Sequence, residues 1–255
     1  MVEEKLKMVN FKLLYALLIA TILISVFTCF ISYIIGVKVG NIIPSSVAFI
    51  SDTGDEKPNS SIFTFGLSLS CMLTFIIIVI RYYQVKLFIE KDKSCNWINQ
   101  FSLICGLTLV FGKLTVAAFQ ISNIKAIHYF GAAMYFGGTT LFCATQSYFT
   151  YRKFKNKYQL IFLVQITSTA VMIISLIIFG IFMTPSLSKY NRKGGNVAQS
   201  FEWLLVSCQF TFLLTFLYDF RSFEIELKFR EIKVVDKIVI ESEELIASTP
   251  DTKRT

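Results

Sequence analysis

The chain contains 255 residues, of which 54% are hydrophobic and only 16% are charged. Soluble domains carry about 25% charged residues, and a soluble fold of this length cannot bury so much apolar surface. The composition therefore excludes a disordered protein, a disulfide-stabilised secreted domain and a soluble enzyme, and it predicts a polytopic membrane protein. The net charge of +8 comes from basic residues at the ends of apolar segments, which is a topology signal and excludes a nucleic-acid partner.

Six apolar segments follow one another along the chain. They cover residues 13–35, 62–80, 97–119, 129–150, 160–183 and 202–219. Each approaches the roughly 20 residues that a helix needs to cross a bilayer, and backbone groups in lipid must form their hydrogen bonds within a helix. The first segment is too long for a signal-peptide core and lacks a cleavage site, so we expect it to remain as an anchor. The sequence predicts an all-α bundle of six transmembrane helices within residues 1–220.

The distribution of lysine and arginine predicts the orientation of this bundle. With both termini in the cytosol, 18 basic residues lie on the cytosolic side and six in the opposite loops, which follows the positive-inside rule. Residues 221–255 then form a cytosolic tail, which begins with mixed charge and ends in polar residues. We expect this tail to be partly disordered.

Four polar residues are predicted to share one depth on the lumenal side of the membrane. They are Asp52 in the first lumenal loop, Lys113 in the third segment, His128 at the start of the fourth and Glu202 at the start of the sixth. Ionisable groups at this depth are costly and usually have partners, so we predict a lumenal polar cluster. It could be a structural ion-pair network, or a headgroup site, or it could include a pH sensor at His128; alternatively, Lys113 snorkels to the interface.

Asp52-Thr53-Gly54 has the sequence of the aspartic-protease triplet. That chemistry needs two carboxylates that share one proton, and the chain has one such triplet, so we interpret it as an Asx-type turn. The single histidine has no nucleophile or second base to work with. We therefore predict no catalytic residue, no metal site and no cofactor, and the chain is not expected to be an enzyme.

Two residues are candidates for covalent modification. Asn59 begins an N-x-[ST] sequon in the first lumenal loop and is a glycosylation candidate. Cys95 lies in a short basic loop beside a membrane end and is an acylation candidate, with an unmodified thiol as the alternative. The other five cysteines fall within apolar segments and are interpreted as small buried side chains, because no zinc or disulfide spacing is present.

The tail contains one short motif of the acidic dileucine form. Glu241 is followed, after three residues, by Leu245 and Ile246. An extended cytosolic segment of this kind offers one carboxylate and two apolar side chains to a coat adaptor. We predict an address to endosomes and lysosomes, with an ordinary acidic tail as the alternative.

Motifs spread over most of the chain resemble one known family. These are Ile50 to Gly54, Pro58, Ser61 to Phe63, Arg81-Tyr82, Val85, Ala118 to Gln120, His128, Gly131-Ala132, Phe136, Gly138, Gln146 to Tyr148, Glu202-Trp203, Leu214 to Phe216 and Asp219-Phe220. They resemble the Frag/DRAM/Sfk superfamily, and within it the DNA-damage-regulated autophagy modulators (DRAM proteins).

The resemblance implies a non-enzymatic, multi-pass protein of the lysosomal or endosomal membrane that modulates autophagy and in some cases cell death. Its implied partners are membrane lipids and the autophagy machinery. Other relatives imply an alternative, a lipid-handling protein that acts in phosphoinositide-kinase recruitment at the plasma membrane, in lipid asymmetry or in remodelling of GPI-anchor lipids.

Two mechanisms follow from the residues. In the first, basic cytosolic residues attract anionic headgroups and the protein is a scaffold; Arg81, Lys86, Arg152 and Lys153 are the residues concerned. In the second, Asp52, His128 and Glu202 contact a lipid headgroup on the lumenal side. A channel or transporter is disfavoured because the fourth and fifth segments carry no charge.

Overall fold

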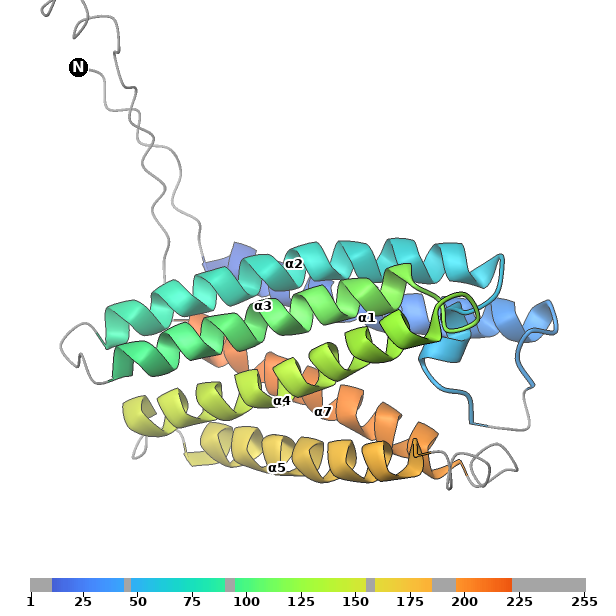
Figure 1. The fold of residues 1–255 in the computed structure, drawn as a ribbon. Coiled ribbons are helices and arrows are strands. Elements are labelled where there is room, and N and C mark those ends of the chain that lie inside the picture. Colours follow the sequence, from blue (N-terminus) through green and yellow to red (C-terminus); the bar gives the residue numbers. More distant parts are fainter. Residues whose placement is uncertain (1–10, 44–46, 90–94, 155–158, 185–195, 222–255) are drawn as a thin grey trace, which may run out of the picture. The chain divides into compact units, whose positions relative to one another are not determined.

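The computed structural model describes residues 11–43, 47–89, 95–154, 159–184 and 196–221. Within these ranges the chain forms six long α-helices and one short 3-10 helix (Figure 1). In chain order they are α1 (Phe11–Lys38), η1 (Ser51–Gly54), α2 (Asn59–Phe88), α3 (Asn96–Ala118), α4 (Lys125–Phe154), α5 (Gln159–Phe182) and α7 (Val197–Phe220). No strand is present in this part of the chain, so the predicted all-α class is confirmed.

Five of these helices are long and apolar enough to cross a membrane: α1, α2, α3, α5 and α7. Helix α4 has 30 residues, but its composition is less apolar. At 1.5 Å per residue it is about 45 Å long, more than the hydrocarbon core requires. The chain is a polytopic helical membrane protein; a membrane crossing by α4 and a cytosolic location for both termini stay predictions.

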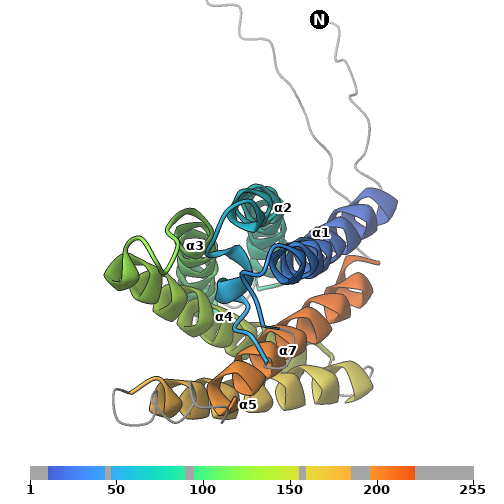
Figure 2. The ribbon, with the colours of Figure 1, turned by 90° about the vertical axis from the view of Figure 1, so that its right-hand side faces the viewer.

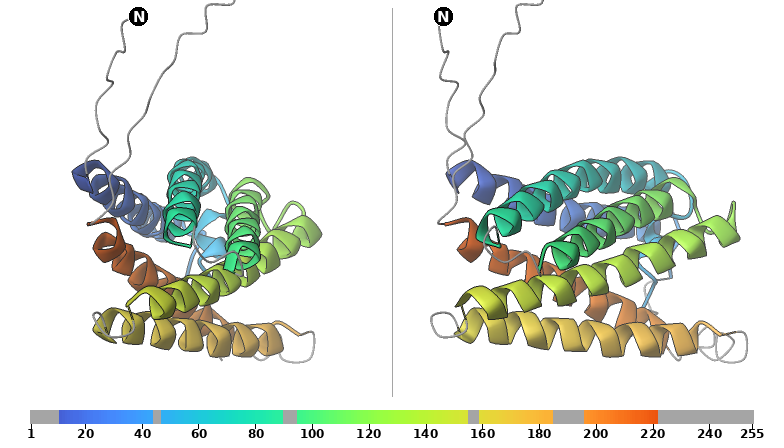
Figure 3. Two further views of the ribbon diagram at one scale, coloured as in Figure 1. Left: turned by 90° about the vertical axis from the view of Figure 1, so that its left-hand side faces the viewer. Right: turned by 60° about the vertical axis from the view of Figure 1, so that its left-hand side comes forward.

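The helices form a ring in which each packs against the next. Contacts join α1 to α2, α2 to α3, α3 to α4, α4 to α5, α5 to α7, and α7 back to α1. Successive helices run in alternating directions, so that the start of α1 and the end of α7 lie at the same end of the bundle (Figures 1 and 3). The opposite end, seen face-on in Figure 2, has η1 in the middle of the ring. This is the end predicted to be lumenal.

Helices α1, α2, α4 and α7 extend beyond their apolar segments at both ends. Helix α2 begins at Asn59 and continues to Phe88, although its apolar segment covers only 62–80. Polar residues continue a helix readily when their side chains find partners inside the bundle. Arg81 is therefore a helical residue and not a loop residue, and it is only 4% exposed.

Helices α3 and α4 approach each other closely, because glycines line the contact. A Cβ atom on Gly112 would overlap the backbone nitrogen of Tyr135, and one on Gly138 would lie 2.7 Å from the backbone nitrogen of Leu109. Small residues allow this approach in membrane bundles, where dispersion contacts drive association. The neighbouring Gly137 has no other atom within 4 Å of such a position.

Candidate functional site: a polar cavity beneath the 3-10 helix

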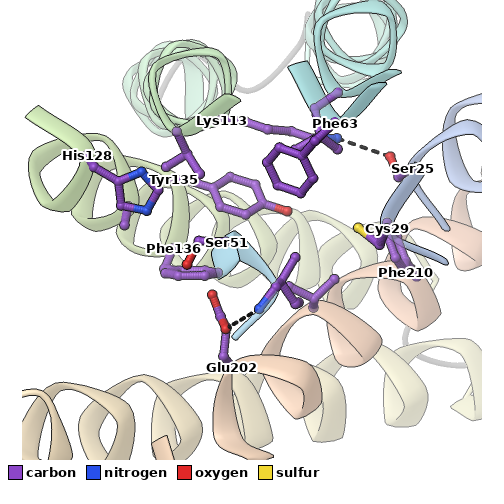
Figure 4. A pocket seen from close by; sticks show the side chains of 15 residues that line it. Ser25, Cys29, Ser51, Phe63, Lys113, His128, Tyr135, Phe136, Glu202 and Phe210 are labelled. Carbon is purple, nitrogen blue, oxygen red and sulfur yellow. Dashed lines mark hydrogen bonds between the residues drawn. The ribbon is translucent and has the colours of Figure 1, made fainter. Parts of the chain in front are cut away.

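A cavity lies inside the bundle beneath η1, and its lining comes from five helices and the η1 segment (Figure 4). We call it the η1 cavity. Most of the wall is apolar, with Phe63 from α2, Phe136 from α4 and Phe210 from α7 among its side chains. Polar groups enter it from several sides, among them those of Ser25, Lys113, His128, Tyr135 and Glu202.

The Lys113 side chain points into the bundle. It is 5% exposed, and its Nζ donates hydrogen bonds to Ser25 Oγ at 3.1 Å and Ser70 Oγ at 2.7 Å. Snorkelling to the interface, one alternative for this residue, is therefore wrong. The two serines lie on α1 and α2, so this amino group joins three helices.

Glu202 connects the start of α7 to the loop that carries η1. Its Oε2 accepts a hydrogen bond of 2.8 Å from the backbone N–H of Ile50. The next residue, Trp203, donates from Nε1 to the carbonyl of Ala48 at 3.0 Å. A third bond reaches the loop from the α3–α4 connection, where the Ser122 N–H donates to Asp55 Oδ1 at 2.8 Å. These bonds fix the loop across the cavity.

His128 and Tyr135 bring further polar atoms to the cavity from α4. The Nδ1 atom of His128 lies 2.7 Å from the carbonyl oxygen of Phe119, which accepts a hydrogen bond when this nitrogen carries the proton. The hydroxyl of Tyr135 donates to Gln209 Oε1 on α7 at 2.6 Å. A buried tyrosine hydroxyl normally has such a partner.

Asp52, the fourth member of the predicted cluster, does not line the cavity. Its Oδ2 accepts a hydrogen bond of 3.2 Å from the backbone N–H of Phe49, so it shapes its own turn. Burial raises the pKa of the Asp52 carboxyl above its ordinary value, Asp55 adds to this through charge repulsion, and the Phe49 N–H opposes it. The cavity thus brings together Lys113, His128 and Glu202. No hydrogen bond or ion pair within the described ranges joins any two of the predicted four.

A second buried polar group lies toward the opposite end of the bundle. Arg81 Nη2 lies 2.8 Å from Asp219 Oδ2 on α7, Nε donates to Gln146 Oε1 on α4 at 2.7 Å, and Nη1 donates to Gln84 Oε1 at 2.6 Å. The guanidinium also lies 4.6 Å from the centre of the Phe216 ring. The interpretation of Arg81 as a lipid-facing loop charge is therefore wrong. The sequence did not predict this network, because Arg81 directly follows an apolar segment. A basic residue at such a position is usually a loop residue at the membrane surface.

Asn59 occupies the first position of α2 and has no exposed surface. Its Nδ2 donates to the carbonyl of Thr53 at 2.6 Å, and its Oδ1 accepts from Asn41 Nδ2 at 3.0 Å. A glycan is attached through this same nitrogen. The observed position therefore argues against glycosylation of Asn59.

We expect the chain to show no glycan. Treatment of the full-length protein from cells with an endoglycosidase should leave its electrophoretic mobility unchanged, and Ser61→Ala, which removes the sequon, should have no effect either. A glycoprotein in the same lysate serves as the control for the enzyme. A mobility shift that disappears in Ser61→Ala would show that Asn59 is modified.

Cys95 is also buried, at 3% exposure, against Val85, Ile89 and Phe149. An acylation site needs a thiol that the cytosol can reach, so this position favours the alternative of an unmodified thiol. Cys29, Cys71, Cys105 and Cys143 are buried, and Cys208 is partly buried. The sorting residues Glu241, Leu245 and Ile246 lie outside the described residues.

The described ranges contain no group of three His, Cys, Asp or Glu side chains that could hold a metal ion. What the cavity does offer is an amino group, a carboxyl group and an imidazole among aromatic side chains. This arrangement suits the binding of a polar group inside a membrane bundle.

A polytopic helical bundle with a polar cavity at one end is the class that the fold and site define. The chain belongs to the family described as the Frag1/DRAM/Sfk1/Cwh43P N-terminal domain, which matches residues 13–223. The resemblance found in the sequence motifs is thereby confirmed.

Three relatives show the extent of this similarity. The chain is 28% identical over 209 residues to DNA damage-regulated autophagy modulator protein 1 of Xenopus laevis, a match that covers 77% of this chain and 86% of that protein. It is 30% identical over 178 residues to Transmembrane protein 150A of Xenopus laevis, covering 69% of this chain and 62% of that protein. It is 31% identical over 121 residues to DNA damage-regulated autophagy modulator protein 2 of Homo sapiens, covering 48% of this chain and 45% of that protein. The chain thus spans less than two thirds of the length of Transmembrane protein 150A. No solved structure matches it.

Proposed function

We propose that this chain is a non-enzymatic regulator of autophagy in the membrane of lysosomes or endosomes. The observation that carries the proposal is the similarity to DNA damage-regulated autophagy modulator protein 1, which extends over 77% of this chain and most of that relative. The family model matches residues 13–223, which cover nearly the whole helical bundle, so the similarity to the family is not confined to one motif.

The way in which the bundle uses its polar groups supports a role without catalysis. Glu202 is engaged with the backbone of Ile50, and Arg81 with Asp219. A nucleophile activated by a neighbouring base would be expected in a hydrolase. Instead, the contacts of these charged groups join one helix to another or to a loop, as in a scaffold.

The cytosolic face of such a scaffold includes exposed basic side chains. Lys86 near the end of α2 and Arg152 near the end of α4 are exposed. Each basic residue close to an anionic membrane surface contributes about 1 kcal/mol of attraction. We propose that these side chains hold the cytosolic face against lipid and thereby position the tail for a coat adaptor. Arg81 takes no part in this, because it is buried and paired with Asp219.

The tail should direct the protein to its compartment. In cells that lack the endogenous protein, a tagged full-length chain is expected to overlap with a lysosomal marker and to restore autophagic flux. The double substitution Leu245→Ala, Ile246→Ala should move most of the signal to the plasma membrane, because a coat adaptor can no longer bind the two apolar side chains.

A tail-matched double variant, Val239→Ala, Ile240→Ala, controls for general effects of removing two apolar side chains from this segment. Plasma-membrane signal for the unmodified chain, or unchanged flux in its absence, would contradict the proposal and favour the alternative role at that membrane.

The second candidate, a membrane-lipid-handling protein, is favoured by a different observation. Lys113 and Glu202 line one cavity from opposite walls and make no ion pair with each other. A scaffold does not require this arrangement, whereas the arrangement suits a ligand with polar groups.

A further inference from the structure

The η1 cavity contains two oppositely charged side chains that are buried apart. Lys113 and Glu202 are each 5% exposed and both line the cavity. Both are described residues, and no ion pair within 4.0 Å joins Lys113 to Glu202, in contrast to Arg81 and Asp219. Burying a charge without a counter-charge is strongly unfavourable, and the group otherwise shifts to its neutral form. A group located between the two, with both signs of charge, would remove this cost.

Both side chains have unused hydrogen-bonding capacity. An ammonium has three protons, and Lys113 donates to two hydroxyls, those of Ser25 and Ser70. Glu202 uses Oε2 for the Ile50 N–H, while its Oε1 accepts no hydrogen bond from any described residue. His128 adds a further acceptor, because a neutral ring that donates from Nδ1 to the Phe119 carbonyl has a lone pair on Nε2.

The size and walls of the cavity restrict what can bind. The empty space of the cavity, counted together with its open part, measures about 540 Å³, which is in the range of sites that bind small molecules. Phe63, Phe136 and Phe210 line this space, and four of the five helices that contribute to it are long and apolar enough to span a membrane. A ligand with both a polar group and apolar chains fits this lining.

We propose that the η1 cavity binds the headgroup of a zwitterionic membrane lipid with a primary amine, its phosphate at Lys113 and its ammonium at Glu202. The amine must be primary because a trimethylammonium group has no N–H to donate to Glu202 Oε1. Inositol and glycerol headgroups have a phosphate but no cation for the carboxylate. This inference deepens the lipid-handling candidate and does not rest on the role in autophagy.

Titration of the purified full-length protein with defined lipids tests the proposal. Delipidated protein in detergent is mixed with phosphatidylethanolamine or phosphatidylcholine of identical acyl chains, and bound lipid is counted by native mass spectrometry. We expect phosphatidylethanolamine to bind at least about tenfold more tightly, since its primary ammonium can donate a hydrogen bond to the Glu202 carboxylate. Equal affinity for the two lipids would overturn the proposal.

Two substitutions test which side chain binds the ammonium of the headgroup and which binds the phosphate. Glu202→Gln keeps an oxygen for the Ile50 N–H and should bind both lipids equally, because it loses only the advantage of the primary amine. Lys113→Met should weaken both lipids about tenfold, because both have the phosphate. Glu56→Gln and Lys57→Met remove the same charges from exposed positions and should behave as the unmodified protein.

Size-exclusion chromatography and thermal unfolding of each variant establish whether it is folded. If either cavity variant fails to fold, the comparison of the two lipids on the unmodified protein decides the question alone.

Free phosphoethanolamine distinguishes a lipid from a soluble source of the same chemistry. It should compete with phosphatidylethanolamine only at high concentration, because the acyl chains also contribute to binding. Binding of free phosphoethanolamine without binding of the lipid would overturn the assignment to a membrane lipid. These measurements are independent of localisation and autophagic flux, so that each proposal can fail separately.

Discussion

Replacing Arg81 with methionine is expected to lower the free energy of unfolding by about 3–5 kcal/mol. The substitution leaves the Asp219 carboxylate buried without the guanidinium that lies 2.8 Å away, and a buried charge that loses its partner is strongly destabilising. It also removes the N–H groups that donate hydrogen bonds to the side-chain oxygens of Gln146 and Gln84. Equilibrium unfolding of the purified protein in mixed micelles, followed by circular dichroism, measures the loss.

The double substitution Arg81→Met, Asp219→Leu separates the ion pair from general damage to the core. Apolar residues of similar volume can replace a buried ion pair at little cost, so this variant should recover most of the lost stability. Lys86→Met, on the exposed side of the same helix, should change stability by less than about 0.5 kcal/mol. A small loss in Arg81→Met, or no recovery in the double variant, would contradict the buried ion pair.

Gly138→Ala should lower the free energy of unfolding by about 1–3 kcal/mol, in the range of other overpacked cores. The added methyl group would lie 2.7 Å from the backbone nitrogen of Leu109 and 2.9 Å from the carbonyl oxygen of Cys105. Because both contacts are to backbone, no rotamer change can relieve them, and α3 and α4 must move apart. The same unfolding measurement in mixed micelles tests this.

The adjacent Gly137 provides the matched control. A methyl group there meets nothing within 4 Å, so Gly137→Ala should leave the helix contact intact. Alanine also forms helices more readily than glycine, by about 1 kcal/mol, and the control should be as stable as the unmodified chain or more stable. Equal losses in both variants would show that the contact is not the cause.

Hydropathy was sufficient to predict the helices but not their ends. Each of the six apolar segments overlaps one helix, because a run of apolar residues in lipid has no other way to satisfy its backbone. Helices α1, α2, α4 and α7 extend further, and where such an end lies depends on side-chain partners. Residues 81–88 of α2 are an example, since Arg81 is stabilised by residues of α4 and α7.

The sequence also indicated part of the cavity. Lys113, His128 and Glu202 were expected at one depth, and all three line the same space. Ser25 was missed, because a serine inside an apolar segment resembles a packing residue. Tyr135 could have been identified from the sequence, since a tyrosine within a membrane segment needs a hydrogen-bond partner for its hydroxyl. Which atoms face each other across the bundle depends on helix rotation, which hydropathy does not determine.

The contacts of α7 have a consequence for how the protein is made. Glu202 and Trp203 hold backbone atoms that lie 152 and 155 positions earlier, and Gln84 donates to the carbonyl of Asp219, 135 positions later. The ribosome must therefore finish α7 before these earlier groups find their partners. A chain released before residue 197 lacks the carboxylate that pairs with the buried Arg81 guanidinium, so we expect such a chain to be less stable than the complete bundle.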